Sequence, residues 1–320
     1  MSVSTFTVVY IITCNGCNLF ADMALVSMLS LRVSNPGLRV VAVADEASAR
    51  AIKLARHRLL EICDELVPVP TPPGDGTFRN RWIKTQLDQF IPGSVLYLDS
   101  DTLVRKPLVE LPRLVSELGA AANHNGATLE QQIWSEDAAA CGKMGWPANF
   151  RVYVNGGVFF FKPCVPVREF FGKWHELWLS CVSSHGWMRD QPAVSRAVEL
   201  SRVNLQVLPP VFNAQPAVSW EYVTEAVVWH FHSSSGVKFS FDHLVSKSRQ
   251  TDLNHLTKLV STAIKSTAPW PNRDLVARWL ARKVAANGKP KPSEVYWLTG
   301  KRLLALRVIG GVVKRYVLGK

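Results

Sequence analysis

The chain of 320 residues has no apolar run of about 18 residues, the length that a membrane-spanning helix requires. Charged residues are also few, at 19%, whereas 48% of the residues are hydrophobic and 11 are Trp, which excludes an intrinsically disordered chain. The first 20 residues lack the basic start and the small-residue cleavage site of a secretory signal. We therefore expect a globular cytoplasmic protein with one large core or two modest ones.

Cysteine is scarce, and its spacing excludes the common structural metal sites. The chain has six Cys, of which Cys14 and Cys17 form a lone CxxC. A structural zinc site needs four ligands, and the sequence has neither a second CxxC nor an HxxxH pair. We interpret the cysteines as reduced thiols of a cytosolic fold.

Acidic residues are scarce in one part of the chain, the C-terminal residues 265–320. Residues 265–320 contain 13 Lys and Arg but only two acidic residues, whereas the preceding residues are almost neutral, so this segment carries most of the net charge of +12. A helical projection of residues 305–317 separates aliphatic from basic side chains, although Gly310 and Gly311 weaken such a helix. We predict a basic helical extension over 251–320, whose residues 301–320 contact an anionic membrane surface from the cytoplasmic side. A helix that packs back on the domain is the alternative.

The N-terminal part alternates β-branched apolar runs with amphipathic segments of helical length. Strands that are apolar throughout and separated by helices are typical of a mostly parallel sheet covered on both faces. The sequence therefore predicts an α/β, Rossmann-like domain over residues 1–250. Strands are expected at Thr5–Thr13, Arg39–Ala44, Glu65–Val69, Val95–Leu98, Ala120–Asn123, Val152–Lys162, Leu205–Leu208 and Ala226–His230, and helices at Ala21–Arg32, Glu46–Leu60, Arg79–Phe90, Leu129–Cys141, Val165–Ser183 and Asp190–Leu200.

Two carboxylates follow the most apolar of the later strands. The segment Val95-Leu-Tyr-Leu-Asp99-Ser100-Asp101-Thr-Leu places Asp99 and Asp101 at the carboxyl edge of the sheet, where open α/β folds bind ligands. Neighbouring carboxylates repel each other, and a divalent cation with a preference for oxygen ligands removes this repulsion. A turn-forming, helix-capping pair is the alternative without function.

Two classes of enzyme carry such a DxD after an apolar strand. Nucleotide-sugar glycosyltransferases of the GT-A fold use it to hold a metal and a diphosphate, whereas haloacid-dehalogenase-type phosphatases use the first Asp, here Asp99, as a nucleophile. The phosphatases carry the motif on their first strand and add a later Asp pair. Three strand-helix units precede Asp99 and no such pair follows, so the position favours the transferase.

Four further segments follow the order of one transferase family. They are Trp82-Ile-Lys84-Thr before the acids, then Val154-Asn155-Gly156-Gly157-Val, then Arg189-Asp190-Gln191-Pro, and finally Val228-Trp-His230-Phe-His232 with Gly236-Val-Lys238. From Thr7 to Phe239 the chain resembles family 8 glycosyltransferases, which include glycogenin and bacterial lipopolysaccharide galactosyl- and glucosyltransferases. Departures from the family pattern are Pro192 for an acid of DQD and Phe239-Ser240 for the Pro-Trp after the lysine.

The resemblance implies roles for these residues. Asp99, Asp101 and His230 would bind Mn²⁺ or Mg²⁺, with His232 as an alternative ligand, and Asp190 and Gln191 would face the reacting carbon. The family's donor contacts fall on Lys84, Ser100, Asn155, Gly156, Gly157, Gly236 and Lys238. An Asp at the start of a helix is also an ordinary N-cap, a role compatible with catalysis by Asp190.

The nucleotide end matches the family least well. The family's uracil-reading Asp is missing from Thr13-Cys-Asn15-Gly, so Thr13 and Asn15 are the candidate base contacts. Asp45, after the second strand, is interpreted as a helix cap. The resemblance alone favours UDP.

The implied function is transfer of a hexose from a nucleotide-diphosphate sugar, UDP-hexose by resemblance, to a glycan, glycolipid or protein acceptor with retention of configuration. A lipid-linked acceptor, as in lipopolysaccharide biosynthesis, fits a basic tail at the membrane. No nucleic-acid module is visible and the tail's basic residues lie among aliphatics, so we expect no nucleic-acid partner. The alternatives are the phosphatase and a non-enzymatic binding protein with a basic tail.

Overall fold

The computed structural model describes residues 6–14, 19–123, 132–216, 222–232, 240–266 and 269. The predicted site residues Asn15, Gly236 and Lys238 and the basic segment 301–320 lie outside these ranges. None of the helices among the described residues is long and apolar enough to cross a bilayer.

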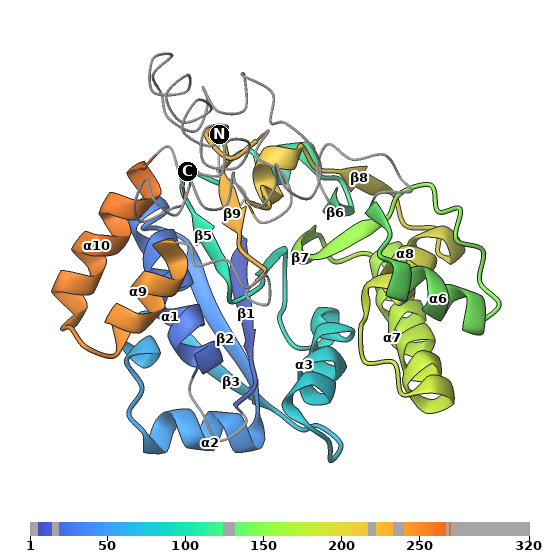
Figure 1. The fold of residues 1–320 in the computed structure, drawn as a ribbon, viewed down its shortest axis with the longest axis horizontal. Helices are drawn as coiled ribbons and strands as arrows, with labels where there is room; N and C mark the ends of the chain where they lie inside the picture. The colour runs from blue at the N-terminus through green and yellow to red at the C-terminus, as the bar shows by residue number, and fades with distance from the viewer. Residues whose placement is uncertain are drawn as a thin grey trace, which may run out of the picture.

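A seven-stranded sheet forms the centre of the fold (Figure 1). The strand order is β3-β2-β1-β4-β7-β6-β8, in which β7 runs antiparallel to β4 and β6 and the other neighbouring pairs are parallel. The predicted α/β domain with a mostly parallel sheet is confirmed. The strands are β1 Thr7–Ile12, β2 Arg39–Asp45, β3 Glu65–Val69, β4 Val95–Leu98, β6 Leu118–Ala122, β7 Val154–Phe161 and β8 Leu205–Val207.

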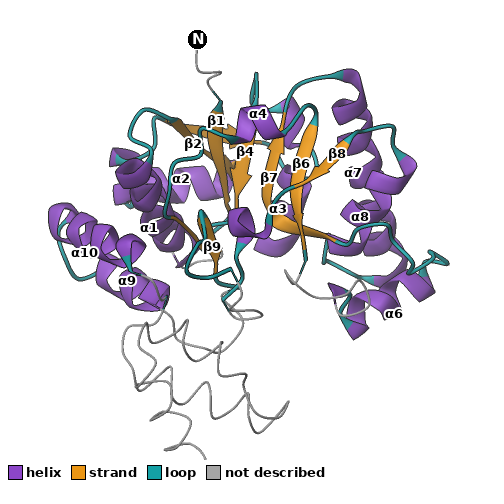
Figure 2. Cartoon of the chain, turned by 90° about the horizontal axis from the view of Figure 1, so that it is seen from above, coloured by secondary structure: helices purple, strands orange, loops and turns teal. Residues whose placement is uncertain are grey.

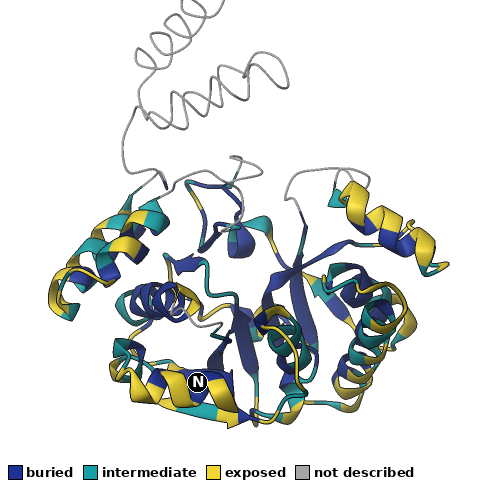
Figure 3. Cartoon of the chain, turned by 60° about the horizontal axis from the view of Figure 1, so that its bottom comes forward, coloured by how far each residue is buried: buried dark blue, intermediate teal, exposed yellow. Residues whose placement is uncertain are grey.

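Alternate residues of the central strands enter two separate cores. In β1, Val8 and Tyr10 belong to the core on one face, and Val9 and Ile11 belong to the core on the other. Both faces are covered by helices, and Figure 3 shows the buried strands between helices whose outer sides are exposed. This double burial explains why the strand sequences are apolar throughout.

The helices divide between the two faces (Figure 2). Buried residues of α1, α9 and α10 line one core, and those of α3, α7 and α8 line the other. The helices are α1 Leu19–Ser34, α2 Glu46–Leu54, α3 Gly76–Lys84, α4 Leu111–Leu114, α6 Ser135–Lys143, α7 Val165–His185, α8 Gln191–Leu200, α9 Ser240–Ser248 and α10 Leu253–Lys265, with 3₁₀ turns at Arg58–Glu61, Leu87–Gln89 and Pro210–Asn213.

Three predicted helices have the wrong bounds. The helix expected to reach Leu60 ends at Leu54, and Arg56 then adopts a left-handed conformation (φ 47°) that a helix cannot contain. The helix expected to begin at Arg79 begins at Gly76, because Asp75 caps it by accepting a hydrogen bond from the backbone N–H of Phe78. The helix expected over Leu129–Cys141 is interrupted at residues 133 and 134, after which α6 runs from Ser135 to Lys143, and residues 129–131 lie outside the described part of the chain.

Helix α9 is absent from the sequence prediction, whereas α10 lies within the predicted helical extension over 251–320 and extends the core beyond residue 250. Leu256, Val260 and Ile264 of α10 are buried in the same core as α1, so the first part of the predicted C-terminal extension packs on the domain. Arg105 anchors this end, since its guanidinium lies 3.9 Å from the ring centre of Trp229 and donates to the backbone carbonyl of Ile264.

Candidate functional site

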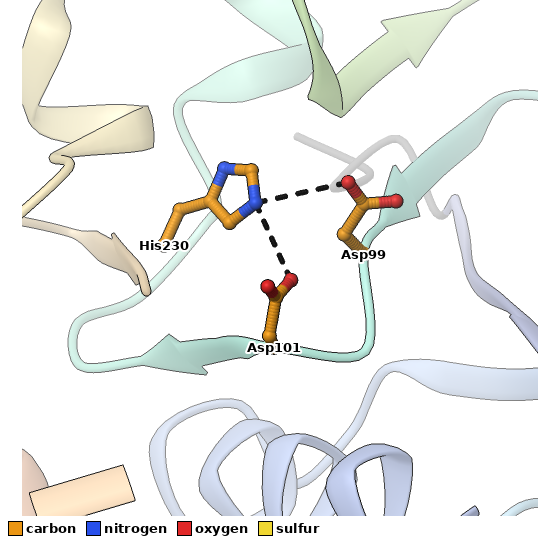
Figure 4. A group of neighbouring side chains, drawn as sticks. All are labelled: Asp99, Asp101 and His230. Carbon is orange, nitrogen blue, oxygen red and sulfur yellow. Dashed lines mark ion pairs between the residues drawn. The ribbon is translucent and has the colours of Figure 1, made fainter. Parts of the chain in front are cut away.

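The two acids of the DxD join strands from separate sheets. Asp99 directly follows the buried β4, and Asp101 leads directly into β5 (Thr102–Val104). β5 pairs antiparallel with β9 (Val228–His230), with Thr102 opposite His230. This pairing brings a histidine from far along the chain to the carboxyl end of β4 (Figure 4).

Asp99, Asp101 and His230 converge on one point. Nε2 of His230 lies 3.3 Å from Oδ1 of Asp101 and 3.7 Å from Oδ2 of Asp99, and one ligand atom from each residue lies within 4.8 Å of the others. Burial opposes protonation of His230, yet the two carboxylates hold its pKa above the ordinary value. Two carboxylates and an imidazole suit Mn²⁺ or Mg²⁺, and the same negative potential favours a cation here.

The two glycines of β7 make room for the side chains of the site. A Cβ at Gly157 would lie 2.2 Å from Cε1 of His230 and 2.9 Å from Oδ2 of Asp99, so no other residue fits without displacing them. A Cβ at Gly156 would lie 3.1 Å from Nζ of Lys84. The glycines thus let the charged side chains lie directly against the strand.

A partly buried network of alternating charge borders the three candidate metal ligands Asp99, Asp101 and His230. Nζ of Lys84 lies 3.5 Å from Oδ1 of Asp99 and 3.4 Å from Oδ2 of Asp190, and Arg81 contacts the other carboxylate oxygen of Asp190 at 3.0 Å. Tyr97 donates a hydrogen bond to Asp99. Lys84 ends α3 and is buried, so its positive charge is held beside the proposed metal ligands.

Asp190 occupies the N-cap position of α8, but its side chain does not cap the helix. Its side chain makes no capping hydrogen bond, and its carboxylate turns instead to Arg81 and Lys84. Burial opposes ionisation of Asp190, but these two cations hold its pKa below the ordinary value. Asp190 is therefore a fixed carboxylate on the wall of the pocket.

A polar pocket collects the predicted catalytic and sugar-binding residues. It is lined by Lys84, Asp99, Gly156, Asp190, Gln191 and His230, together with Arg189 and others. Nε2 of Gln191 is buried and has no hydrogen-bond partner among the described residues. Such an unpaired amide is costly unless a ligand accepts its hydrogen bond.

A second cavity shares Arg81, Asp99 and Asp101 with the first and continues it toward α1. Thr13 and Ser100, both predicted to contact the nucleotide, lie on its wall. The hydroxyl of Thr13 donates to the carbonyl of Gly76 at 2.9 Å.

Asn155 faces the protein more than the pocket. It is 3% exposed, its Oδ1 accepts hydrogen bonds from the Gly157 backbone and from Asn213, and its Nδ2 donates to Asn123. Its predicted contact with the donor sugar stays a prediction.

Neither His232 nor Asp45 belongs to the group of three candidate metal ligands. His232 follows β9 in a left-handed conformation (φ 49°), and its ring lies 4.3 Å from that of His230, outside the group of three ligands found among the described residues. Asp45 caps α2 by accepting from the backbone N–H of Ser48 at 3.1 Å, which confirms the interpretation as a cap.

Sequence reasoning missed Arg81, Asn123 and Asn213. Arg81 lies one helical turn before Lys84, a spacing that places both side chains on one side of α3 and that could have identified it. Asn213 ends the short 3₁₀ turn after β8, where no pattern distinguishes a single buried amide from an exposed one.

The fold is similar to that of solved glycosyltransferases. The glycosyltransferase GlyE of Streptococcus pneumoniae TIGR4 aligns at 16% identity over 84% of this chain and 66% of its own, with a TM-score of 0.51. WbbM, described as a bifunctional glycosyltransferase, aligns at 14% identity over 81% of this chain and 52% of its own, also at 0.51. The galactosyltransferase LgtC, in complex with donor and acceptor sugar analogues, aligns at 17% identity over 80% of this chain and 96% of its own, at 0.47.

No protein-family model and no curated protein sequence matches the chain. The similarity therefore concerns architecture, at identities too low to transfer an activity. The resemblance that the ordered motifs predicted is confirmed at the level of the fold, and the chain has the GT-A type of architecture found in glycosyltransferases.

Proposed function

We propose that the protein is a metal-dependent glycosyltransferase that moves a hexose from a nucleotide-diphosphate sugar to a glycan, glycolipid or protein acceptor. UDP-hexose is the favoured donor. The observation that carries the proposal is the convergence of Asp99, Asp101 and His230 at the carboxyl end of β4. This is the edge at which open α/β sheets bind ligands. The GT-A type of fold supports the same reading.

The three ligands explain how a leaving group could be stabilised. Mn²⁺ or Mg²⁺, when bound there, supplies positive charge to the diphosphate on which negative charge develops. Lys84 is already held 3.5 Å from Asp99 and adds positive charge at the same place. Lys238 and Gly236 complete the proposed diphosphate site on the resemblance alone.

We assign an orienting role to Asp190 and Gln191. Both oxygens of Asp190 face cations, so this carboxylate is poorly disposed to attack a sugar carbon as a nucleophile. It stands in the pocket as a fixed negative charge that can stabilise a cationic sugar in the transition state. The unpaired amide of Gln191 can donate to a sugar hydroxyl. The proposed transfer retains the anomeric configuration without a covalent intermediate.

Thermal unfolding with nucleotides tests the proposal directly. Purified protein is titrated with UDP, GDP, CDP and ADP, each with and without Mn²⁺, since a ligand at ~100 times its Kd stabilises the folded state by about 2.7 kcal/mol. We expect a shift that requires the metal and is largest for one nucleotide. Asp101→Asn should abolish that shift, whereas Glu176→Gln, which removes an exposed carboxylate of α7, should leave it unchanged.

Turnover completes the test and separates the alternatives. Metal-dependent release of the nucleotide from its sugar, lost in Asp101→Asn, supports the transferase. Absence of every nucleotide shift, together with a trapped phosphoryl group on Asp99, would replace it by the phosphatase.

The membrane contact is a separate proposal on residues outside the described ranges. Residues 301–320 carry six Lys and Arg and no acidic residue, which suits an anionic surface and a lipid-linked acceptor. Sedimentation with vesicles of anionic lipid should be strong in low salt and weak in high salt. Equal binding to neutral vesicles, or preferential binding to nucleic acid, would refute it.

A further inference from the structure

Three buried asparagines form a chain behind the proposed metal site. Oδ1 of Asn213 lies 3.0 Å from Nδ1 of His230, and Nδ2 of Asn213 lies 2.9 Å from Oδ1 of Asn155. Nδ2 of Asn155 in turn lies 3.0 Å from Oδ1 of Asn123. Asn123 and Asn213 are 0% exposed and Asn155 is 3% exposed. Buried amides without partners are costly, so each link in the chain has to match a donor with an acceptor.

The backbone fixes the orientation of this chain at one end. The N–H of Gly157 can only donate, and it lies 2.9 Å from Asn155, so the amide atom that receives it is an oxygen. The same Oδ1 is the atom that faces Asn213. Asn213 therefore presents its NH₂ group to Asn155 and its own oxygen to His230.

The opposite end of the chain gives the same orientation independently. The carbonyl of Gln132 can only accept, and it lies 2.6 Å from Asn123, so Asn123 presents its NH₂ group there. Its oxygen then accepts from Nδ2 of Asn155, which leaves the oxygen of Asn155 for Gly157 and Asn213. Two unambiguous backbone groups thus determine every amide in between.

The consequence falls on the protonation of His230. An amide oxygen can only accept, so Nδ1 of His230 has to carry the proton. In the neutral imidazole, Nε2, which faces Asp99 and Asp101 at 3.7 and 3.3 Å, then keeps the lone pair that a metal requires.

We propose that Asn213 is a positioning residue that holds neutral His230 in the Nδ1–H form, so that Nε2 is preorganised as the third ligand of a divalent cation. The inference rests on the proposed metal site and adds to it a residue that no motif predicted. Without the oxygen of Asn213 the neutral imidazole could exchange between its two proton forms, and the Nε2–H form cannot bind the cation.

Histidine nitrogen NMR tests the proton position without any metal or sugar. Protein labelled with ¹⁵N-histidine is titrated until its imidazoles are neutral, and the His230 signals are assigned by their loss in His230→Gln. We expect the proton on Nδ1 in the wild type, and a mixture of both forms in Asn213→Leu, which removes the acceptor but keeps the branching at Cγ. A wild-type spectrum with the proton on Nε2 would overturn the proposal, whatever the variants do.

Metal affinity provides the second measurement. Calorimetry with Mn²⁺ alone should show a loss of about 10- to 100-fold for Asn213→Leu, the usual effect of removing a residue that hydrogen-bonds to a metal ligand. Asn213→Asp loses the hydrogen bond to Asn155, as Asn213→Leu does, but it retains an acceptor for Nδ1–H, so it serves as the matched variant and should bind Mn²⁺ more tightly than Asn213→Leu. Equal losses in both variants would indicate a packing role and refute the inference, as would no loss in Asn213→Leu.

The two measurements separate this inference from the proposed function. A wild type that binds Mn²⁺ with its proton on Nε2 would refute the role of Asn213 and leave the metal site intact. A wild type with the proton on Nδ1 that binds neither Mn²⁺ nor Mg²⁺ would refute the metal site, and the role of Asn213 toward a metal with it.

Discussion

Replacement of Gly157 by Ala is the most specific structural test of the proposed metal site. The added Cβ would lie 2.2 Å from Cε1 and 2.7 Å from Nδ1 of His230, and 2.9 Å from Oδ2 of Asp99. Nonbonded carbon atoms approach to about 3.5 Å, so the imidazole or the strand has to move by roughly 1 Å. Ligand distances of bound metals vary by only about 0.2 Å, so this movement removes His230 from the metal.

The expected result is loss of metal affinity in a protein that still folds. Overpacking of this kind costs about 1–3 kcal/mol of stability. The affinity for Mn²⁺ should fall by about 10- to 100-fold or more, because losses of this size already follow from removing a residue that only hydrogen-bonds to a metal ligand. Calorimetry gives the affinity, and thermal unfolding shows whether the variant is folded at the temperature of the measurement.

Gly156→Ala is the matched control on the same strand. Its Cβ would meet Nζ of Lys84 at 3.1 Å and Oδ2 of Asp190 at 3.7 Å, and the end of a lysine side chain can give way. Its Mn²⁺ affinity should stay within about threefold of the wild type, under 1 kcal/mol. The reasoning fails if folded Gly157→Ala binds Mn²⁺ as the wild type does, or if both variants lose affinity equally.

Three further substitutions test other parts of the structure. The pKa of Asp190 is held below its ordinary value, so its charge stabilises the fold above the unfolded pKa of about 3.9, and this contribution is lost as the pH falls through the folded pKa. The melting temperature of Asp190→Asn should accordingly lie below that of the wild type near neutrality and approach it in acid; a constant difference would contradict the ion pairs. Lys84→Met should lower kcat/KM for the nucleotide sugar by about 100-fold, while Lys173→Met on the surface of α7 leaves it unchanged, and similar rates in both would remove Lys84 from the site. Asp45→Ala should cost about 1 kcal/mol in denaturant unfolding through loss of the α2 cap, and no loss would show that the cap is dispensable.

The central strands could be predicted because burial on both faces leaves a strong mark in the sequence. β4 has the bounds that its four apolar residues indicate, Val95–Leu98, and β3 also matches the prediction at both ends. The ends of helices depend on single residues instead. Asp75 starts α3 three residues before the expected helix, and Arg56 shows that the chain has left α2 well before Leu60.

Strand β5 could not be predicted, although it carries the geometry of the site. Its three residues, Thr102–Val104, are too few to form a pattern, and they are held by pairing with β9 from much later in the chain. The sequence could place Asp99, Asp101 and His230 in one family pattern. Only the pairing of Thr102 with His230 gives a physical reason for them to meet.

Asp190 shows where a local pattern stops being informative. At the start of a helix, an aspartate can accept hydrogen bonds from the backbone N–H groups or can serve in an active site, and the sequence allows both roles. Two cations of α3 decide between these roles. Arg81 and Lys84 contact the carboxylate of Asp190, which therefore makes no hydrogen bond to the end of α8. Because a buried carboxylate follows the nearest cations, the role of Asp190 is set by residues about a hundred positions earlier. The same holds for His230, whose proton is placed by the backbone of Gly157 through two amides. Motifs identify the groups that can act, whereas the buried partners that fix their charge and protons become visible only in the folded chain.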